Sequence, residues 1–229
     1  MKLSFVFPVL GEEEGLKKIL RSVYKNKSLK NFNKEILIVW TPIKKLNYFK
    51  KIQKIAKKFN AKIIIERGGY GKAYRRGFHM ASGDIIIAAD SDGSYPLDST
   101  AKFLRVLLNE NLDFISINRF NNLEKGSMKF MNFIGNKILT FLVNFLFNLK
   151  MKDSQSGMWI FKKDILKKLN LKQNDISLAT EIKVKAFKKF RCKEVNGKYK
   201  KRLGKKRTNS IIVGISQILF IIKYFWFRT

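Results

Sequence analysis

The stretch from Arg67 to Pro96 constrains the fold most, because it combines a glycine-rich turn, a short helix and an apolar run that ends in two acidic residues. The glycines allow a sharp turn and a close approach of backbone N–H groups to a ligand. Residues 85–89 are apolar throughout, which predicts a strand buried on both faces. Asp90 and Asp92 follow it, at the edge where open α/β sheets bind their ligands.

The spacing of these two aspartates suggests a cation site. Alternate residues of an extended chain point the same way, so both carboxylates can face one hard divalent ion. The alternative is a simple turn, since Asp, Ser and Gly are ordinary turn formers. The glycine-rich turn and the buried strand that precede Asp90 and Asp92 favour the ligand site.

Apolar runs alternate with amphipathic helical patterns along the first half of the chain. This alternation predicts a mostly parallel, doubly wound α/β sheet flanked by helices. The strands that we expect cover residues 3–9, 35–40, 61–66, 85–89 and 113–118, with a last strand at 193–199.

The segment Gly71 to Pro96 resembles the corresponding part of family 2 glycosyltransferases, the inverting enzymes of the GT-A fold, and in particular the dolichyl- or polyprenyl-phosphate sugar transferases. The resemblance implies a GT-A domain that uses a nucleotide-sugar donor. It also implies that Asp90 and Asp92 hold a Mg²⁺ or Mn²⁺ ion bridging the donor diphosphate, with Asp92 essential for catalysis and Gly71 beside the donor.

Residues 7–15, FPVLGEEEG, resemble the first motif of the same family. By that resemblance Pro8, Val9 and Glu12 would hold the nucleotide base and ribose. The family usually has an acidic turn after its second strand, but this chain reads Val-Trp-Thr-Pro there. The sequence therefore leaves open which base the donor carries.

Two further motifs belong to the acceptor side in the resembling enzymes. Asn118-Arg119-Phe120 resembles the family's Ser-Arg-Tyr element, which implies that Arg119 lies close to phosphate, and Lys129 falls where a basic residue often contacts the lipid phosphate. The segment that begins at Asp153 resembles an Asp-x-x-Ser/Thr-Gly-Phe element. Asp153 is a candidate acid/base residue. It is as readily a positioning residue, because a phosphate acceptor is already ionised and needs no general base.

A basic segment near the C-terminus resembles the loop that folds over the diphosphate. It reads Tyr199-x-x-Arg202-x-Gly204 and continues through lysines to Arg207, so both arginines are candidate donor-binding residues. The alternative is a solvated basic run. Glu181 fills a recurrent acidic position of the family and could contact the sugar or form a salt bridge to a neighbouring lysine.

Two apolar segments suggest contact with a membrane surface. In residues 130–149 a narrow polar stripe recurs every four residues on a wide apolar helix, a pattern suited to lying in the membrane interface; the alternative is an ordinary buried helix. Residues 211–227 end in bilayer-typical aromatics. We therefore expect a GT-A domain over 1–207, with an interfacial helix at about 127–149, and a membrane-associating helix over 208–229.

The net charge of +31 implies an anionic partner. Together with the resemblance, it favours the cytoplasmic face of the cell membrane and a polyprenyl- or dolichyl-phosphate acceptor, with no nucleic-acid partner. A polysaccharide acceptor, a basic nucleic-acid-binding protein and a non-catalytic family member remain alternatives. His79 and the single cysteine, Cys192, have no partners at metal or nucleophile spacing, and we expect both to be structural.

Overall fold

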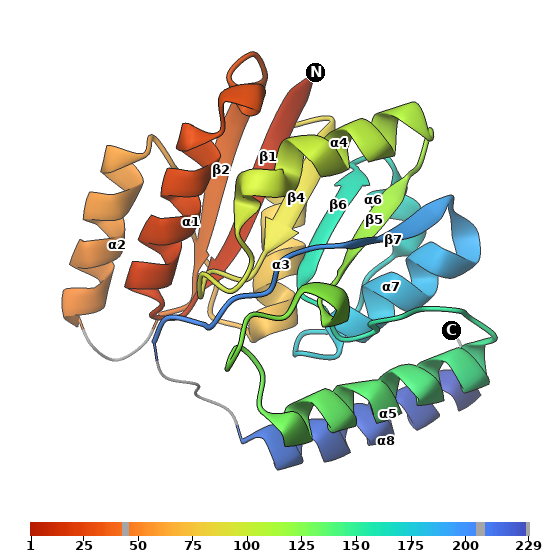
Figure 1. The fold of residues 1–229 in the computed structure, drawn as a ribbon. Helices are drawn as coiled ribbons and strands as arrows, with labels where there is room; N and C mark the ends of the chain where they lie inside the picture. Colours follow the sequence, from red (N-terminus) through yellow and green to blue (C-terminus); the bar gives the residue numbers. More distant parts are fainter. Residues whose placement is uncertain (43–45, 205–208, 228–229) are drawn as a thin grey trace.

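The computed structural model describes residues 1–42, 46–204 and 209–227. These residues form a mixed sheet of seven strands in the order β3-β2-β1-β4-β6-β5-β7 (Figure 1). The strands are β1 (Lys2–Val9), β2 (Asn33–Trp40), β3 (Lys62–Ile65), β4 (Ile85–Ala89), β5 (Phe114–Asn118), β6 (Met158–Lys162) and β7 (Cys192–Asn196). Only β6 runs antiparallel to its neighbours, β4 and β5. The predicted mostly parallel α/β sheet is therefore confirmed.

Helices cover both faces of the sheet (Figure 1). One core contains α1 (Glu13–Lys25), α2 (Leu46–Lys58) and α4 (Thr100–Asn109), and the other contains α3 (Tyr70–Met80), α6 (Ile165–Leu169) and α7 (Leu178–Lys189). Strand β4 supplies Ile85, Ile87 and Ala89 to the first core and its other two residues to the second. This burial on both faces is why the strand is apolar throughout. Short 3-10 helices cover Lys27–Leu29, Leu97–Ser99 and Phe120–Asn122.

Helices α5 (Phe130–Phe147) and α8 (Ser210–Trp226) form a separate layer and lie side by side beyond the edge of the sheet (Figure 1). The polar stripe of α5 faces the protein: Thr140 Oγ1 lies 3.1 Å from Ser154 Oγ, and Asn144 binds the backbone of Met151. Its apolar side faces outward, with Phe141 71% and Phe145 74% exposed. The alternative of an ordinary buried helix is therefore wrong.

The length and composition of α5 would allow it to cross a membrane, and 22% of this 18-residue stretch is buried inside the protein. Helix α8 is apolar but shorter.

Two details differ from the sequence-based expectations. The last strand ends at Asn196 and not at residue 199. Gly197, the next residue, packs so tightly on β5 that a Cβ there would lie 2.4 Å from Ile117 Cγ2. Strand β6 was not predicted. Its apolar residues do not reveal its direction, which depends on the path of α5 between β5 and β6.

Candidate active site

Asp90 directly follows β4 and is held by two tyrosines of α3. The hydroxyl of Tyr70 donates to its Oδ1 at 2.7 Å, and that of Tyr74 at 3.2 Å. Burial, reinforced by the nearby charge of Asp92, raises the pKa of Asp90 to about 7, although the two hydroxyls act against this rise. The charges of Asp90 and Asp92 therefore oppose each other, and an oppositely charged ligand at this place would relieve that repulsion.

Asp92 lies in the turn after Asp90 and is 7% exposed. Its Oδ1 accepts a hydrogen bond from the Ser94 N–H at 2.9 Å, and its Oδ2 lies 3.6 Å from a guanidinium nitrogen of Arg202. The N–H of Leu203 donates to the backbone oxygen of Asp92 at 2.8 Å. The predicted basic loop thus crosses over the Asp-x-Asp turn, and within the described part of the chain Arg202 Nε is buried without a hydrogen-bond partner.

The first turn of α1 approaches the same place. A Cβ at Gly15 would lie 2.4 Å from the backbone oxygen of Ser91, so only glycine lets the helix come so close. The carboxylate of Glu12 accepts the N–H groups of Leu10 and Gly11, both at 2.9 Å, and lies 3.5 Å from Ser91 Oγ. Glu12 therefore lies beside the Asp-x-Asp turn, and its contact with the nucleotide base and ribose stays a prediction.

The structure gives less direct evidence for the other residues that were predicted to bind the nucleotide-sugar donor. Val9 is buried in the core at the end of β1, and Pro8 beside it is half-buried. Gly71 lies against residues 173–175, where a Cβ would come within 2.6 Å of Asp175 O. These positions leave the nucleotide contacts of Pro8, Val9 and Gly71 as predictions. Arg207 lies outside the described residues.

Arg119 and Asp153 form a buried, bidentate ion pair. Arg119 Nε donates to one carboxylate oxygen at 2.7 Å and a terminal nitrogen donates to the other at 2.8 Å, while the backbone N–H of Arg119 adds a third bond at 3.1 Å. Asp153 is completely buried and Arg119 is 7% exposed. Burial alone would raise the pKa of Asp153, but the guanidinium outweighs it and holds that pKa below its usual value.

The turn that begins with Asp153, residues 153–157, connects this ion pair to Asp90. We call it the acceptor turn. Its last residue, Gly157, lies so close to Asp90 that a Cβ would be 2.5 Å from Asp90 Oδ2. The N–H of Gly157 donates to Tyr95 Oη at 2.8 Å. The structure therefore brings together Asp90, Asp92, Arg119, Asp153 and Arg202, although these residues are far apart in the sequence.

Lys183 of α7 is a buried cation under the acceptor turn. Its Nζ donates to Asp153 O and to Ser156 Oγ, both at 2.8 Å, and the residue is 0% exposed. Burial lowers the pKa of Lys183 to about 7, and the charge of Asp153 acts against this fall. The sequence analysis missed Lys183, since a single lysine in a lysine-rich helix carries no distinguishing signal.

The remaining candidates lie further out or have structural partners. Lys129 is exposed and precedes the first residue of α5. Glu181 is buried and forms a 2.7 Å ion pair with Lys185, so of its two expected roles the structure supports the salt bridge. Tyr70 and Tyr74 were also missed as partners of Asp90. The only signal was their position, in the glycine-rich turn and one helical turn after it.

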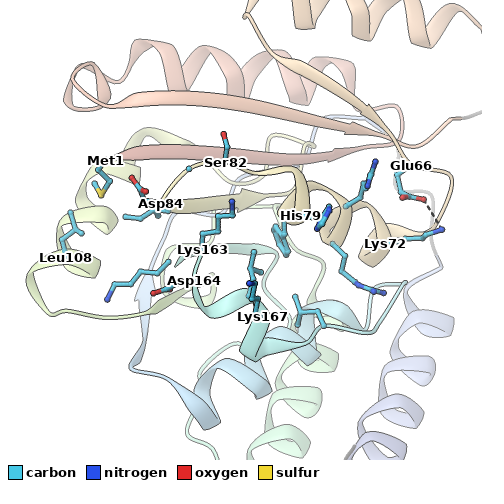
Figure 2. Close-up of a pocket in the computed structure, with 18 residues that line it drawn as sticks. Met1, Glu66, Lys72, His79, Ser82, Asp84, Leu108, Lys163, Asp164 and Lys167 are labelled. Atoms are coloured by element: carbon cyan, nitrogen blue, oxygen red, sulfur yellow. Dashed lines mark ion pairs between the residues drawn. The ribbon is translucent and has the colours of Figure 1, made fainter.

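A cavity of about 1180 Å³ lies elsewhere, along α3 and α6 near the amino ends of β1 and β4 (Figure 2). Its lining includes His79, Lys163 and Lys167, together with the ion pair between Glu66 and Lys72 (Figure 2). None of the five residues gathered around the acceptor turn lines it. We therefore assign it no part in the candidate site.

No cluster of three or more His, Cys, Asp or Glu side chains suited to a metal ion occurs among the described residues. A cation at Asp90 and Asp92 would therefore need ligands from a bound molecule as well. The donor set still fits a hard cation, because it consists of carboxylate oxygens at the ligand edge of the sheet.

Known proteins resemble this chain in sequence and in fold. The family model described as glycosyl transferase family 2 matches residues 4–170. The chain is 27% identical over 168 residues to a low-salt glycan biosynthesis hexosyltransferase of Haloferax volcanii, and 27% identical over 173 residues to a dolichyl-phosphate hexose transferase of the same organism. These matches cover 71% and 74% of this chain, but 41% and 74% of the relatives.

Solved structures show the same fold. Glucosyl-3-phosphoglycerate synthase from Mycobacterium tuberculosis with bound phosphoglyceric acid superposes with a TM-score of 0.73 at 16% identity, over 97% of this chain and 79% of that one. The same enzyme with Mn²⁺ and UDP-glucose gives a TM-score of 0.71, also at 16% identity, over 98% and 78% of the two chains. These superpositions confirm the GT-A fold that was expected from the sequence.

Proposed function

Since this chain belongs to glycosyl transferase family 2, we propose that it moves a hexose from a nucleoside-diphosphate sugar to a polyprenyl or dolichyl phosphate at a membrane surface, with inversion at the anomeric carbon. The observation that carries the proposal is the placement of Asp90 and Asp92 at the carboxyl end of β4, beneath the loop that bears Arg202. A dolichyl-phosphate hexose transferase among the relatives supports the acceptor class.

The donor diphosphate would lie between the acidic pair and the Arg202 loop. Arg202 supports this assignment because its guanidinium, whose Nε has no hydrogen-bond partner among the described residues, can donate to a phosphate oxygen. Asp90 and Asp92 are the residues that would hold a divalent cation, Mg²⁺ or Mn²⁺. When bound, such a cation neutralises the charge that develops on the leaving diphosphate. Glu12, with Pro8 and Val9 behind it, lies where the nucleoside would extend, and Arg207 would complete the basic loop.

The acceptor phosphate would approach from the side of Arg119, with Lys129 at the entrance. A fixed guanidinium suits this task because it remains charged and grips two phosphate oxygens at once. Asp153 is fully buried against Arg119, which favours a positioning role over proton transfer. A phosphate monoester is already ionised at neutral pH, so its oxygen can attack the anomeric carbon without a general base.

The outward face of α5 and α8 would rest in the bilayer interface. Exposed apolar side chains on both helices support this, among them Phe141 and Phe145 on α5 and Leu219 and Trp226 on α8. The net charge of +31 would add attraction to an anionic leaflet, at roughly 1 kcal/mol for each basic residue near the surface. We therefore propose that the protein acts at the cytoplasmic face of the cell membrane.

The test is direct assay of the product. The protein is incubated with Mn²⁺, dolichyl phosphate and either UDP-glucose, UDP-N-acetylglucosamine or GDP-mannose, and the lipid fraction is analysed by mass spectrometry. We expect one donor to yield a hexosyl-phospholipid. Transfer to soluble saccharides but not to the lipid would replace the proposed acceptor. Salt-sensitive RNA binding without transfer from any donor would support the non-catalytic alternative.

A further inference from the structure

The buried ammonium of Lys183 bonds to none of the side chains assigned to the donor, the cation or the acceptor phosphate. Its two hydrogen-bond acceptors, Asp153 O and Ser156 Oγ, belong to the two halves of the acceptor turn. Lys183 is 0% exposed, so it cannot touch a donor or an acceptor itself. Any effect on the reaction must therefore pass through the acceptor turn.

The acceptor turn connects two parts of the site. At one end, the carboxylate of Asp153 grips the guanidinium of Arg119, and at the other, Gly157 rests against the carboxylate of Asp90. Ser156, between them, also lies 3.2 Å from Ser116 Oγ of β5. By holding both Asp153 O and Ser156 Oγ, Lys183 fixes the distance between the two ends.

Stability does not explain a lysine at this position. Transfer of an ammonium group out of water costs several kcal/mol, and well-packed apolar residues often replace buried charges at no loss of stability. Both acceptors of Lys183 are neutral, and the nearby carboxylate of Asp153 already has its own partner in Arg119. An apolar side chain of the same length would leave the Asp153 carboxylate paired with Arg119 and would remove only the two hydrogen bonds to the acceptor turn.

We propose that Lys183 is a positioning residue, which fixes the acceptor turn so that Asp153 orients Arg119 while Gly157 packs against Asp90. This inference rests on the proposed function, because it assigns Lys183 to the alignment of the acceptor phosphate. It adds a residue that contacts neither substrate.

The test compares Lys183→Met with Lys185→Met. Lys185 is the matched control: it lies on the same helix, is 9% exposed, and forms an ion pair with Glu181 and a hydrogen bond to Asn170 O. We expect Lys183→Met to remain folded, to lower kcat by about tenfold or more and to raise KM for dolichyl phosphate, with KM for the nucleotide sugar unchanged. Lys185→Met should lower Tm and leave kcat unchanged.

Amide hydrogen exchange provides a readout that needs no turnover. The N–H groups of Asp153, Ser154, Gln155 and Gly157 all donate to side-chain acceptors, so their exchange reports opening of the acceptor turn. We expect exchange there to rise about tenfold in Lys183→Met and not in Lys185→Met. If the wild-type protein transfers no sugar, the proposed function fails and this exchange alone decides on Lys183.

Ser156→Ala removes one acceptor of Lys183 and serves if Lys183→Met does not fold. We expect it to lower kcat by about threefold, with KM for the nucleotide sugar unchanged. A folded Lys183→Met with wild-type kcat and wild-type exchange in the acceptor turn would overturn the proposal. So would a Ser156→Ala protein with wild-type kcat, where Lys183→Met is unfolded.

Discussion

The hydroxyl of Tyr70 lies 2.7 Å from Oδ1 of Asp90, so one of the two carboxylates of the candidate metal site is held by a side chain of α3. This bond stabilises the ionised form of a side chain whose pKa is raised to about 7 by burial and by the charge of Asp92. The hydrogen bond from Tyr70 therefore helps to keep Asp90 ionised, as binding of a cation would require.

We expect Tyr70→Phe to weaken binding of UDP or GDP with Mn²⁺ by about tenfold near neutral pH, because a hydrogen bond to a charged group contributes about 1.5–3 kcal/mol. Loss of the donor raises the pKa of Asp90 further, so the deficit should shrink as the pH rises. Isothermal titration at several pH values measures this. Tyr24→Phe, which removes a hydroxyl bound to Phe59 O, is the control and should bind like the wild type.

Asp92→Asn should abolish sugar transfer and leave the fold intact. The amide keeps the hydrogen bond from the Ser94 N–H but loses the charge that a cation needs. Product formation and Tm are measured together, with Asp98→Asn, an exposed aspartate of the next turn, as the control. Full turnover by Asp92→Asn would contradict the metal assignment.

Arg119→Met should destabilise the protein by about 3–5 kcal/mol, because it strands the buried carboxylate of Asp153. In the double variant with Asp153→Leu most of this loss should disappear, since neither charge is left without a partner. Urea unfolding of the two single variants and the double variant gives the coupling energy, which we expect to exceed about 1 kcal/mol. Strictly additive losses would contradict the ion pair.

The free energy of unfolding should fall at low pH because Glu35 becomes protonated. Burial raises its pKa, but hydrogen bonds from Ser4 and Ser82, helped by Lys2, outweigh it and lower the value from 4.5 to about 2. The unfolded chain therefore binds more protons, and about 3 kcal/mol present above pH 4.5 is lost as the pH falls towards 2. Unfolding free energies of the wild type and Glu35→Gln should converge over this range. Parallel curves would exclude Glu35 as the cause.

Phe141→Ser and Phe145→Ser should each reduce flotation with anionic liposomes by about tenfold or more, since an exposed phenylalanine contributes about 1.5–3 kcal/mol when buried. Met80→Ser removes an exposed apolar side chain away from α5 and α8 and should float like the wild type.

Deletion from Ile211 onward should weaken flotation more than nucleotide binding. The opposite ranking would contradict an interfacial role for α8.

The sequence predicted the features that depend on local pattern. The apolar run before Asp90, the β-α alternation and the polar stripe of α5 all follow from periodicity, and the structure agrees with each. It did not predict that Tyr70 holds Asp90 or that Lys183 holds the acceptor turn. Those contacts join residues from different elements, which local pattern does not reveal, and Lys183 is one of 48 lysines and arginines in the chain.

The reversed direction of β6 has a geometric consequence for α5. Because β6 is antiparallel to β5, the strand that enters α5 leaves the sheet at the same margin to which the chain then returns. Both ends of the apolar helix α5 are therefore connected to the same edge of the sheet. A membrane surface in contact with this helix would therefore lie within reach of Asp90 and Asp92. The proposed reaction would then take place at that surface and not in the bulk solution.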